Sequence, residues 1–187
     1  ARGTKYPSLI DAALICENSG ADSITLHLRE DRRHIQDNDV IELKSRLKTK
    51  MNLEMAATDE MLKIASNVLP EDCCLVPEKR QELTTEGGLD VASQIVRMKE
   101  VCTQLSSNNI KTSLFIDADK RQIDAAAECG VPIIEIHTGH YADAASKDES
   151  ELELKRISDA CEYAVSLGMQ VNAGHGLTLL NTSAVAK

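Results

Sequence analysis

Aromatic residues are scarce in this sequence, and positive charge is not in excess. It has three tyrosines, one phenylalanine and no tryptophan, so it offers few side chains on which nucleic-acid bases could stack. Acidic residues outnumber basic residues by 30 to 21, which gives a net charge of −9. Such a balance argues against a nucleic-acid-binding surface.

Long apolar runs and paired cysteines are also missing. No run approaches the ~20 residues that a membrane-spanning helix needs. None of the six cysteines belongs to the C-x-x-C pairs that are typical of zinc ribbons and thioredoxin-type sites. We expect six reduced, mostly buried thiols, and a soluble, cytoplasmic globular protein that binds neither nucleic acid nor membranes.

Two kinds of segment alternate along the chain. Apolar or β-branched runs predict strands, and the stretches between them place apolar residues at helical steps of three and four. One such stripe consists of Val91, Ile95, Met98, Cys102 and Leu105. After a first helix near residues 7–19, the predicted strands are 22–28, 51–55, 73–77, 111–117, 132–137 and 169–173. We expect one domain over residues 1–187, built on a parallel sheet.

The predicted strands carry polar residues at every second position, which favours one parallel fold over another. These pairs are Thr25 and His27, Asn52 and Glu54, Ser113 and Asp117, and Glu135 and His137. A doubly wound sheet is covered by helices on both faces and should be apolar throughout. In a closed barrel, alternate residues point into the interior and the last ones reach its mouth. We therefore predict an α/β fold of the TIM (β/α)8 barrel type.

That barrel needs eight strands and about 250 residues, whereas this sequence has six predicted strands in 187 residues. We expect that one strand before Ala1 and one after Lys187 are absent from it. It would then be a fragment, or the ordered part of a longer chain.

Glu54 and His27 are candidates for acid–base chemistry. Glu54 lies between apolar neighbours, where a carboxylate needs a charged partner or has a raised pKa. A raised pKa near a cleft suits a general acid or base. His27 lies at a strand end, where catalytic residues of parallel barrels are found. A structural ion pair for Glu54 and a structural imidazole for His27 remain open.

Three loop segments point to an anionic substrate. Arg29, Arg32, Arg33 and His34 follow His27 directly, and arginine suits phosphate oxygens, although a solvated charged loop would look the same. His175 lies between two glycines at the end of the last strand, where the backbone can approach a ligand or simply turn. Residues 77–88, with charged side chains and two adjacent glycines, suit a lid over the site or an exposed loop.

Three functions fit these residues. Metal-free acid–base catalysis on a phosphorylated substrate is favoured. His27, His137, His175 and the glutamates could instead ligate a metal, as in a metal-dependent barrel epimerase or hydrolase. However, no H-x-H or H-x-x-x-H pair lies on a predicted strand or helix. A non-catalytic barrel that binds ligands or mediates assembly is the third. A lysine Schiff base is disfavoured because Lys111, at an amino end, is the only lysine within the predicted strands.

Seven segments, in register over essentially the whole chain, match the motifs of one family. They are RGTKYP at 2–7, HLREDRRHI at 27–35, MNLEM at 51–55, LVPEKRQELTTEGGLD at 75–90, SLFIDAD at 113–119, EIHTG at 135–139 and VNAGHGLT at 171–178. In these segments the sequence resembles the pyridoxine 5′-phosphate synthase family. The resemblance implies a TIM barrel with extra helices that assembles as an octamer and makes the vitamin B6 ring.

The resemblance also implies a reaction and the residues that serve it. The enzyme would condense 3-amino-2-oxopropyl phosphate with 1-deoxy-D-xylulose 5-phosphate, releasing phosphate and water, without a metal or an organic cofactor. His27 and Glu54 would accept protons, and His175 would donate one. The implied substrate-binding residues are Arg29, His34 and Thr84 for the deoxyxylulose phosphate, and Arg2 and Gly176 for the amino ketone phosphate.

Two family motifs fall outside this sequence. They are the Asn-x-Asp-His motif of the first strand and the phosphate-binding Gly-His pair of the last strand. We therefore expect the sequence by itself to lack part of both substrate sites, and to be inactive and poorly folded alone.

Overall fold

The computed structural model describes residues 8–78 and 87–186. Its centre is a six-stranded parallel sheet in which the strands pair in chain order, from β1 to β6. The strands are β1 (Ser23–His27), β2 (Lys50–Met55), β3 (Asp72–Leu75), β4 (Lys111–Ile116), β5 (Ile133–His137) and β6 (Gln170–Gly174). Every predicted strand is confirmed, with ends that differ by two residues at most.

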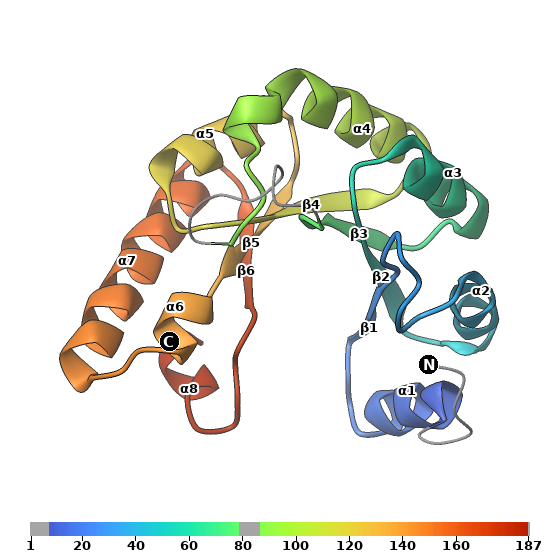
Figure 1. The fold of residues 1–187 in the computed structure, drawn as a ribbon, viewed down its shortest axis with the longest axis horizontal. Helices are drawn as coiled ribbons and strands as arrows, with labels where there is room; N and C mark the ends of the chain where they lie inside the picture. Colours follow the sequence, from blue (N-terminus) through green and yellow to red (C-terminus); the bar gives the residue numbers. More distant parts are fainter. Residues whose placement is uncertain (1–7, 79–86, 187) are drawn as a thin grey trace.

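Helices cover the outer side of the curved sheet (Figure 1). The long ones are α1 (Leu9–Asn18), α2 (Asp37–Arg46), α3 (Asp59–Val68), α4 (Ile95–Ser107), α5 (Lys120–Glu128) and α7 (Lys147–Ser166). The short ones are α6 (Gly139–Ala142), α8 (Thr182–Val185) and the 3₁₀ turn η2 (Ala92–Gln94). Side chains that accept a first-turn N–H begin four of the helices, as N-caps do; they are Ser8, Thr58, Asp119 and Ser146.

The sheet and its helices form an arch, with α1 and β1 at one end and β6 and α8 at the other (Figure 1). Consecutive parallel strands that curve in this way, each followed by a helix on the outside, make half of a TIM-type barrel. The predicted fold class is confirmed to that extent. None of the described helices is long and apolar enough to cross a membrane.

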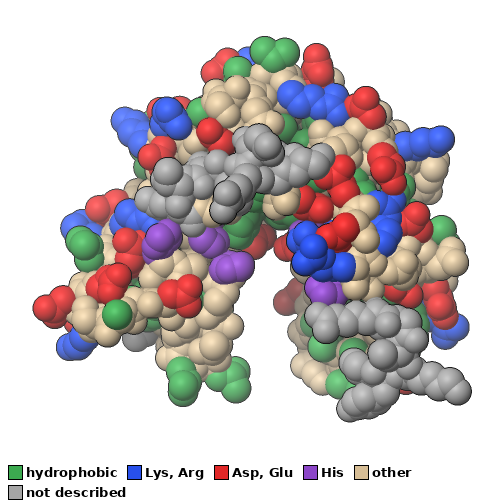
Figure 2. Space-filling view, in the orientation of Figure 1, with side chains coloured by type: hydrophobic (Ala, Val, Ile, Leu, Met, Phe, Trp, Pro, Cys, Tyr) green, Lys and Arg blue, Asp and Glu red, His purple; other side chains and the backbone are tan. Residues whose placement is uncertain are grey.

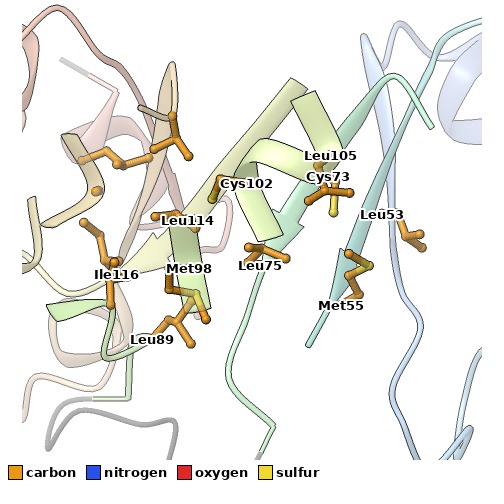
Figure 3. Packing of buried hydrophobic residues seen from close by; sticks show 14 of the residues in the cluster. Leu53, Met55, Cys73, Leu75, Leu89, Met98, Cys102, Leu105, Leu114 and Ile116 are labelled. Atoms are coloured by element: carbon orange, nitrogen blue, oxygen red, sulfur yellow. The ribbon is translucent and has the colours of Figure 1, made fainter. Parts of the chain in front are cut away.

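The core lies between the outer face of the sheet and the helices. Leu53, Leu75 and Leu114 on neighbouring strands are fully buried, and they belong to one apolar cluster with Met98 and Leu105 of α4 (Figure 3). Each such side chain stabilises the fold by about 2 kcal/mol through burial. Four of the five members of the stripe predicted from residue 91 onward are buried, but the α-helix itself begins only at Ile95.

The inner face of the sheet is polar, as the alternation predicts. Thr25 lies opposite Asn52 in the register, and His27 lies opposite Glu54. The Asn52 amide donates a hydrogen bond to the Thr25 hydroxyl (3.3 Å). Because successive residues of a strand point to opposite faces, apolar side chains meet the helices and polar ones meet the hollow of the arch.

All six cysteines are free thiols. Cys73, Cys74 and Cys102 are buried, and burial raises the pKa of the Cys74 thiol well above its ordinary value. Cys16 is exposed, and Cys129 and Cys161 are partly buried. The expectation of mostly buried thiols is therefore confirmed for the sheet and α4 only.

Candidate active site

A cavity of about 510 Å³ lies at the carboxyl ends of the strands. Its lining comprises His27, Arg29, Glu54, Val76, Pro77, Gly87, Phe115, Glu135, His137 and His175. On the face shown in Figure 2, histidine side chains cluster on one side of the hollow of the arch, and a single histidine patch lies on the other side. Four predicted site residues, far apart in the sequence, therefore border one space.

His27 ends β1 between two carboxylates. Its Nε2 lies 3.2 Å from Glu78 Oε1, and its Nδ1 lies 3.8 Å from Glu54 Oε2. The Glu78 side chain is only 4% exposed, whereas those of His27 and Glu54 are 30% and 23% exposed. His27 and Glu54 thus remain open to the cavity while Glu78 lies behind them.

Two carboxyl groups in the cavity have raised pKa values. Burial raises the pKa of Glu54, against the opposing effect of charge on His27 and His175. Burial, and then the negative charge of Glu54, raise the pKa of Glu135 to about 7. Groups that gain and lose protons near neutral pH are suited to general acid–base catalysis.

A second imidazole–carboxylate pair closes the other side of the cavity. His137 Nδ1 lies 3.2 Å from Asp117 Oδ1, which also accepts a hydrogen bond from the Gly88 N–H (3.1 Å). The His137 ring lies 4.9 Å from the ring of His175 and 5.2 Å from that of Phe115, centroid to centroid. Asp117 thus fixes His137, and His137 packs against the candidate proton donor.

The segment that carries His175 depends on its glycine neighbours. A Cβ atom on Gly174 would come within 2.2 Å of Glu135 Oε1, so only glycine leaves room for that carboxylate. His175 and Gly176 both have positive φ (81° and 73°), a conformation that favours glycine. The Thr138 hydroxyl contacts the carbonyl oxygens of Gly174 and His175 at 2.7 Å each. This arrangement turns His175 toward the cavity.

The predicted substrate-binding residues are placed differently. Arg29 lines the cavity, and its guanidinium donates to Asp31 (3.1 and 3.3 Å). Half-buried His34 and exposed Gly176 are not among the lining residues of the cavity, although Gly176 directly follows His175. Arg2 and Thr84 lie outside the described residues, as does most of the predicted lid.

The sequence alone predicts neither a role for Glu78 nor a contact between Asp117 and His137. Glu78 belongs to a charged loop and reaches His27 from two strands away, a contact that no local pattern reveals. Asp117 and His137 were recognised as inward-facing, but their pairing depends on the register of β4 with β5. Among the described residues, no group of three His, Cys, Asp or Glu side chains is arranged to hold a metal ion.

Half-barrels of this kind, with titratable side chains at the carboxyl ends of the strands, define the class of TIM-type barrel enzymes. D-psicose 3-epimerase from Clostridium cellulolyticum H10 matches with a TM-score of 0.51 at 10% identity, over 92% of this chain and 80% of that one. Phosphoribosylanthranilate isomerase from Thermotoga maritima matches with a TM-score of 0.51 at 14% identity, over 91% and 84%. At these identities the likeness concerns the fold alone.

Sequence comparison identifies the family within that class. The family described as "Pyridoxal phosphate biosynthesis protein PdxJ" matches residues 1–187. Proteins named pyridoxine 5′-phosphate synthase from Coxiella burnetii and Photobacterium profundum are 58% identical over 186 residues, which cover 100% of this chain and 78% and 76% of theirs. The chain belongs to this family of pyridoxal phosphate biosynthesis enzymes.

Proposed function

We propose that this enzyme makes pyridoxine 5′-phosphate, by condensing 3-amino-2-oxopropyl phosphate with 1-deoxy-D-xylulose 5-phosphate and releasing phosphate and water. The names of the relatives support the product. The observation that carries the mechanism is the single cavity that His27, Glu54 and His175 share at the carboxyl ends of the strands. Condensation of an amine with a carbonyl (with loss of water), enolisation and elimination all require proton transfers, which positioned acids and bases accelerate.

In this reaction His27 and Glu54 accept protons and His175 donates one. The raised pKa of Glu54 makes it a stronger base when it is ionised, and a cavity that excludes part of the solvent strengthens each transfer. His175 is close enough to affect the pKa of Glu54 through its charge. A proton taken from substrate on one side of the cavity can therefore be returned from the other.

The phosphate groups of the two substrates are bound by separate residues. Arg29, His34 and Thr84 bind the deoxyxylulose phosphate, and Arg2 and Gly176 bind the amino ketone phosphate. Arg29 supports this assignment, because its guanidinium lines the cavity and is 26% exposed beside its Asp31 partner. The reaction as written balances without an oxidant or reductant, and we propose that it needs neither a metal nor an organic cofactor.

Replacing Glu54 with Gln tests the proposal. We expect the kcat for pyridoxine 5′-phosphate formation by the full-length enzyme to fall about 100-fold, because one general base is lost, while KM changes less than about threefold because the amide keeps the shape of the carboxyl. Product is measured from both purified substrates by chromatography.

Asp72→Asn is the matched control. Asp72 lies at the amino end of β3, where it pairs in the register with Asn52, away from the cavity. We expect its kcat to stay within about twofold of the unmodified enzyme, since it takes no part in the acid–base step. Unchanged turnover in Glu54→Gln would remove Glu54 from the chemistry, and absence of product from the unmodified enzyme would refute the reaction itself.

A further inference from the structure

We propose that Glu78 is a positioning residue that fixes the tautomer of His27, so that Nδ1, facing Glu54, is the nitrogen that exchanges protons. Only the kinetic consequence of this inference rests on the proposed function. The tautomer itself is a property of the enzyme without substrate.

Both oxygens of the Glu78 carboxylate have backbone or imidazole partners beside β1. Oε1 lies 3.2 Å from His27 Nε2, and Oε2 accepts the Glu30 N–H at 2.9 Å. Glu78 follows β3, whereas His27 and Glu30 lie at and just beyond the end of β1. The carboxylate therefore reaches from the segment after β3 to the end of β1, across the intervening strand β2.

This contact determines which ring nitrogen carries the proton. An ionised carboxylate only accepts hydrogen bonds, so the imidazole donates to Glu78 from Nε2. In the neutral ring the lone pair is then on Nδ1, 3.8 Å from Glu54 Oε2. Because burial raises the pKa of Glu54, a proton can be shared between this carboxyl and Nδ1 at the cavity surface.

The same division of labour is known from catalytic triads, in which a buried carboxylate orients the histidine that transfers the proton. The charges around His27 allow a carboxylate to orient this histidine in the same way. Glu78 faces one nitrogen and Glu54 faces the other, while the guanidinium of Arg29 is close enough to Glu78 for its own pKa to be raised partly by that charge.

Glu78→Gln should reverse the tautomer without removing the side chain. An amide offers one acceptor and one NH₂ donor. The Glu30 N–H requires the acceptor, so the NH₂ group turns toward His27 Nε2 and donates to it. The proton of the neutral ring then moves to Nδ1, and the nitrogen facing Glu54 can no longer accept one.

The experiment combines ¹⁵N NMR of histidine-labelled enzyme with steady-state kinetics. The sequence has five histidines, and His27→Asn identifies the signal of His27. In the unmodified enzyme we expect the neutral ring of His27 to be protonated at Nε2, and in Glu78→Gln at Nδ1. We also expect kcat to fall about 100-fold in Glu78→Gln, with KM within about threefold, as for loss of one acid–base group. Glu78→Asp, which keeps two acceptor oxygens, should restore the Nε2 tautomer and most of the rate.

Glu71→Gln controls for a merely structural loss. Glu71 also joins two elements through one carboxylate, because it pairs with Lys44 and accepts the Met51 N–H (2.9 Å), but it does so at the amino end of the sheet. We expect it to leave kcat and the His27 signal unchanged. An Nε2 tautomer retained in Glu78→Gln would overturn the proposal, and so would a reversed tautomer with unchanged kcat. Because the NMR result needs no substrate, it decides the role of Glu78 even if the proposed reaction fails.

Discussion

At the scale of single residues, the carboxyl groups of the cavity are its most informative feature. Glu54 and Glu135 are both partly buried on the polar inner face, and each lies within the electrostatic influence of other titratable groups. The two carboxyl groups tend not to be ionised together, since burial raises the pKa of both and the negative charge of Glu54 raises that of Glu135 further. The cavity can therefore hold a proton near neutral pH.

Glu135 makes a pH-dependent contribution to stability. Its pKa is about 7 in the folded chain, against an ordinary value of 4.5, so between these pH values the folded state binds more protons than the unfolded state. The contribution of Glu135 to the free energy of unfolding is greatest below pH 4.5 and is lost as the pH rises through about 7. From about pH 5 to about pH 8, we expect the free energy of unfolding of the unmodified protein to fall by about 2 kcal/mol relative to Glu135→Gln.

Urea denaturation of both proteins at the two pH values measures this change. Glu71→Gln serves as the control, because hydrogen bonds from Lys44 and the Met51 N–H outweigh burial and lower the pKa of Glu71. Its stability difference from the unmodified protein should be constant over the same range. A constant difference for Glu135→Gln as well would show that Glu135 is already ionised throughout.

At the scale of elements, the pairing of β5 with β6 determines where His175 lies. The register places Glu135 opposite Asn172 and His137 opposite Gly174, so the carboxylate of one strand fills space that the glycine of the other leaves empty. A side chain at position 174 would displace Glu135, or would separate the two strands, just before His175.

Gly174→Ala should therefore reduce activity more than the addition of a single methyl group implies. The added Cβ would lie 2.2 Å from Glu135 Oε1, and we expect kcat to fall at least about tenfold and the free energy of unfolding by about 2 kcal/mol, as in overpacked cores. Gly168→Ala is the matched control. Gly168 has a positive φ (84°), but no atom lies within 4 Å of an added Cβ. The Gly168→Ala protein should therefore lose about 1 kcal/mol of stability and keep its activity. Equal activity in both variants would contradict this role for Gly174.

Most of this framework is predictable from the sequence, for a physical reason. The six strands and the polar inner face follow from local periodicity, since a strand has only two sides and one of them is open to the hollow. His27, Glu54 and His175 are recognisable because His27 lies near the end of a predicted strand, Glu54 has apolar neighbours within one, and His175 lies between two glycines just after one. Glu78 was not recognised, because its function comes from a contact with an element about 50 positions earlier in the chain rather than from its neighbours.

At the scale of the whole molecule, several apolar side chains are exposed on the outer helices. Ile15 on α1, Val96 on α4 and Leu152 on α7 are 64%, 70% and 67% exposed. Exposed apolar groups of this size favour association between subunits when they lie in contiguous patches. These side chains are candidates for contacts between subunits of an assembly.

We propose that the full-length enzyme is an octamer in solution, as the family resemblance implies. We expect native mass spectrometry to give a mass eight times that of the denatured subunit, and the same assembly after tenfold dilution, because large apolar interfaces dissociate slowly. A species of one-subunit mass at all concentrations would contradict the octamer without affecting the assignment of the cavity.

The strictly consecutive order of the strands has a consequence for how the protein matures. Every sheet pairing joins segments that are near in sequence, the longest being between β3 and β4, where Asp72 pairs with Lys111. A growing chain can thus add one βα unit after another to the edge already formed. His27 meets Glu54 early in this succession, while His175 arrives only with the sixth strand. Chemical competence therefore cannot be acquired before the sixth strand has been added.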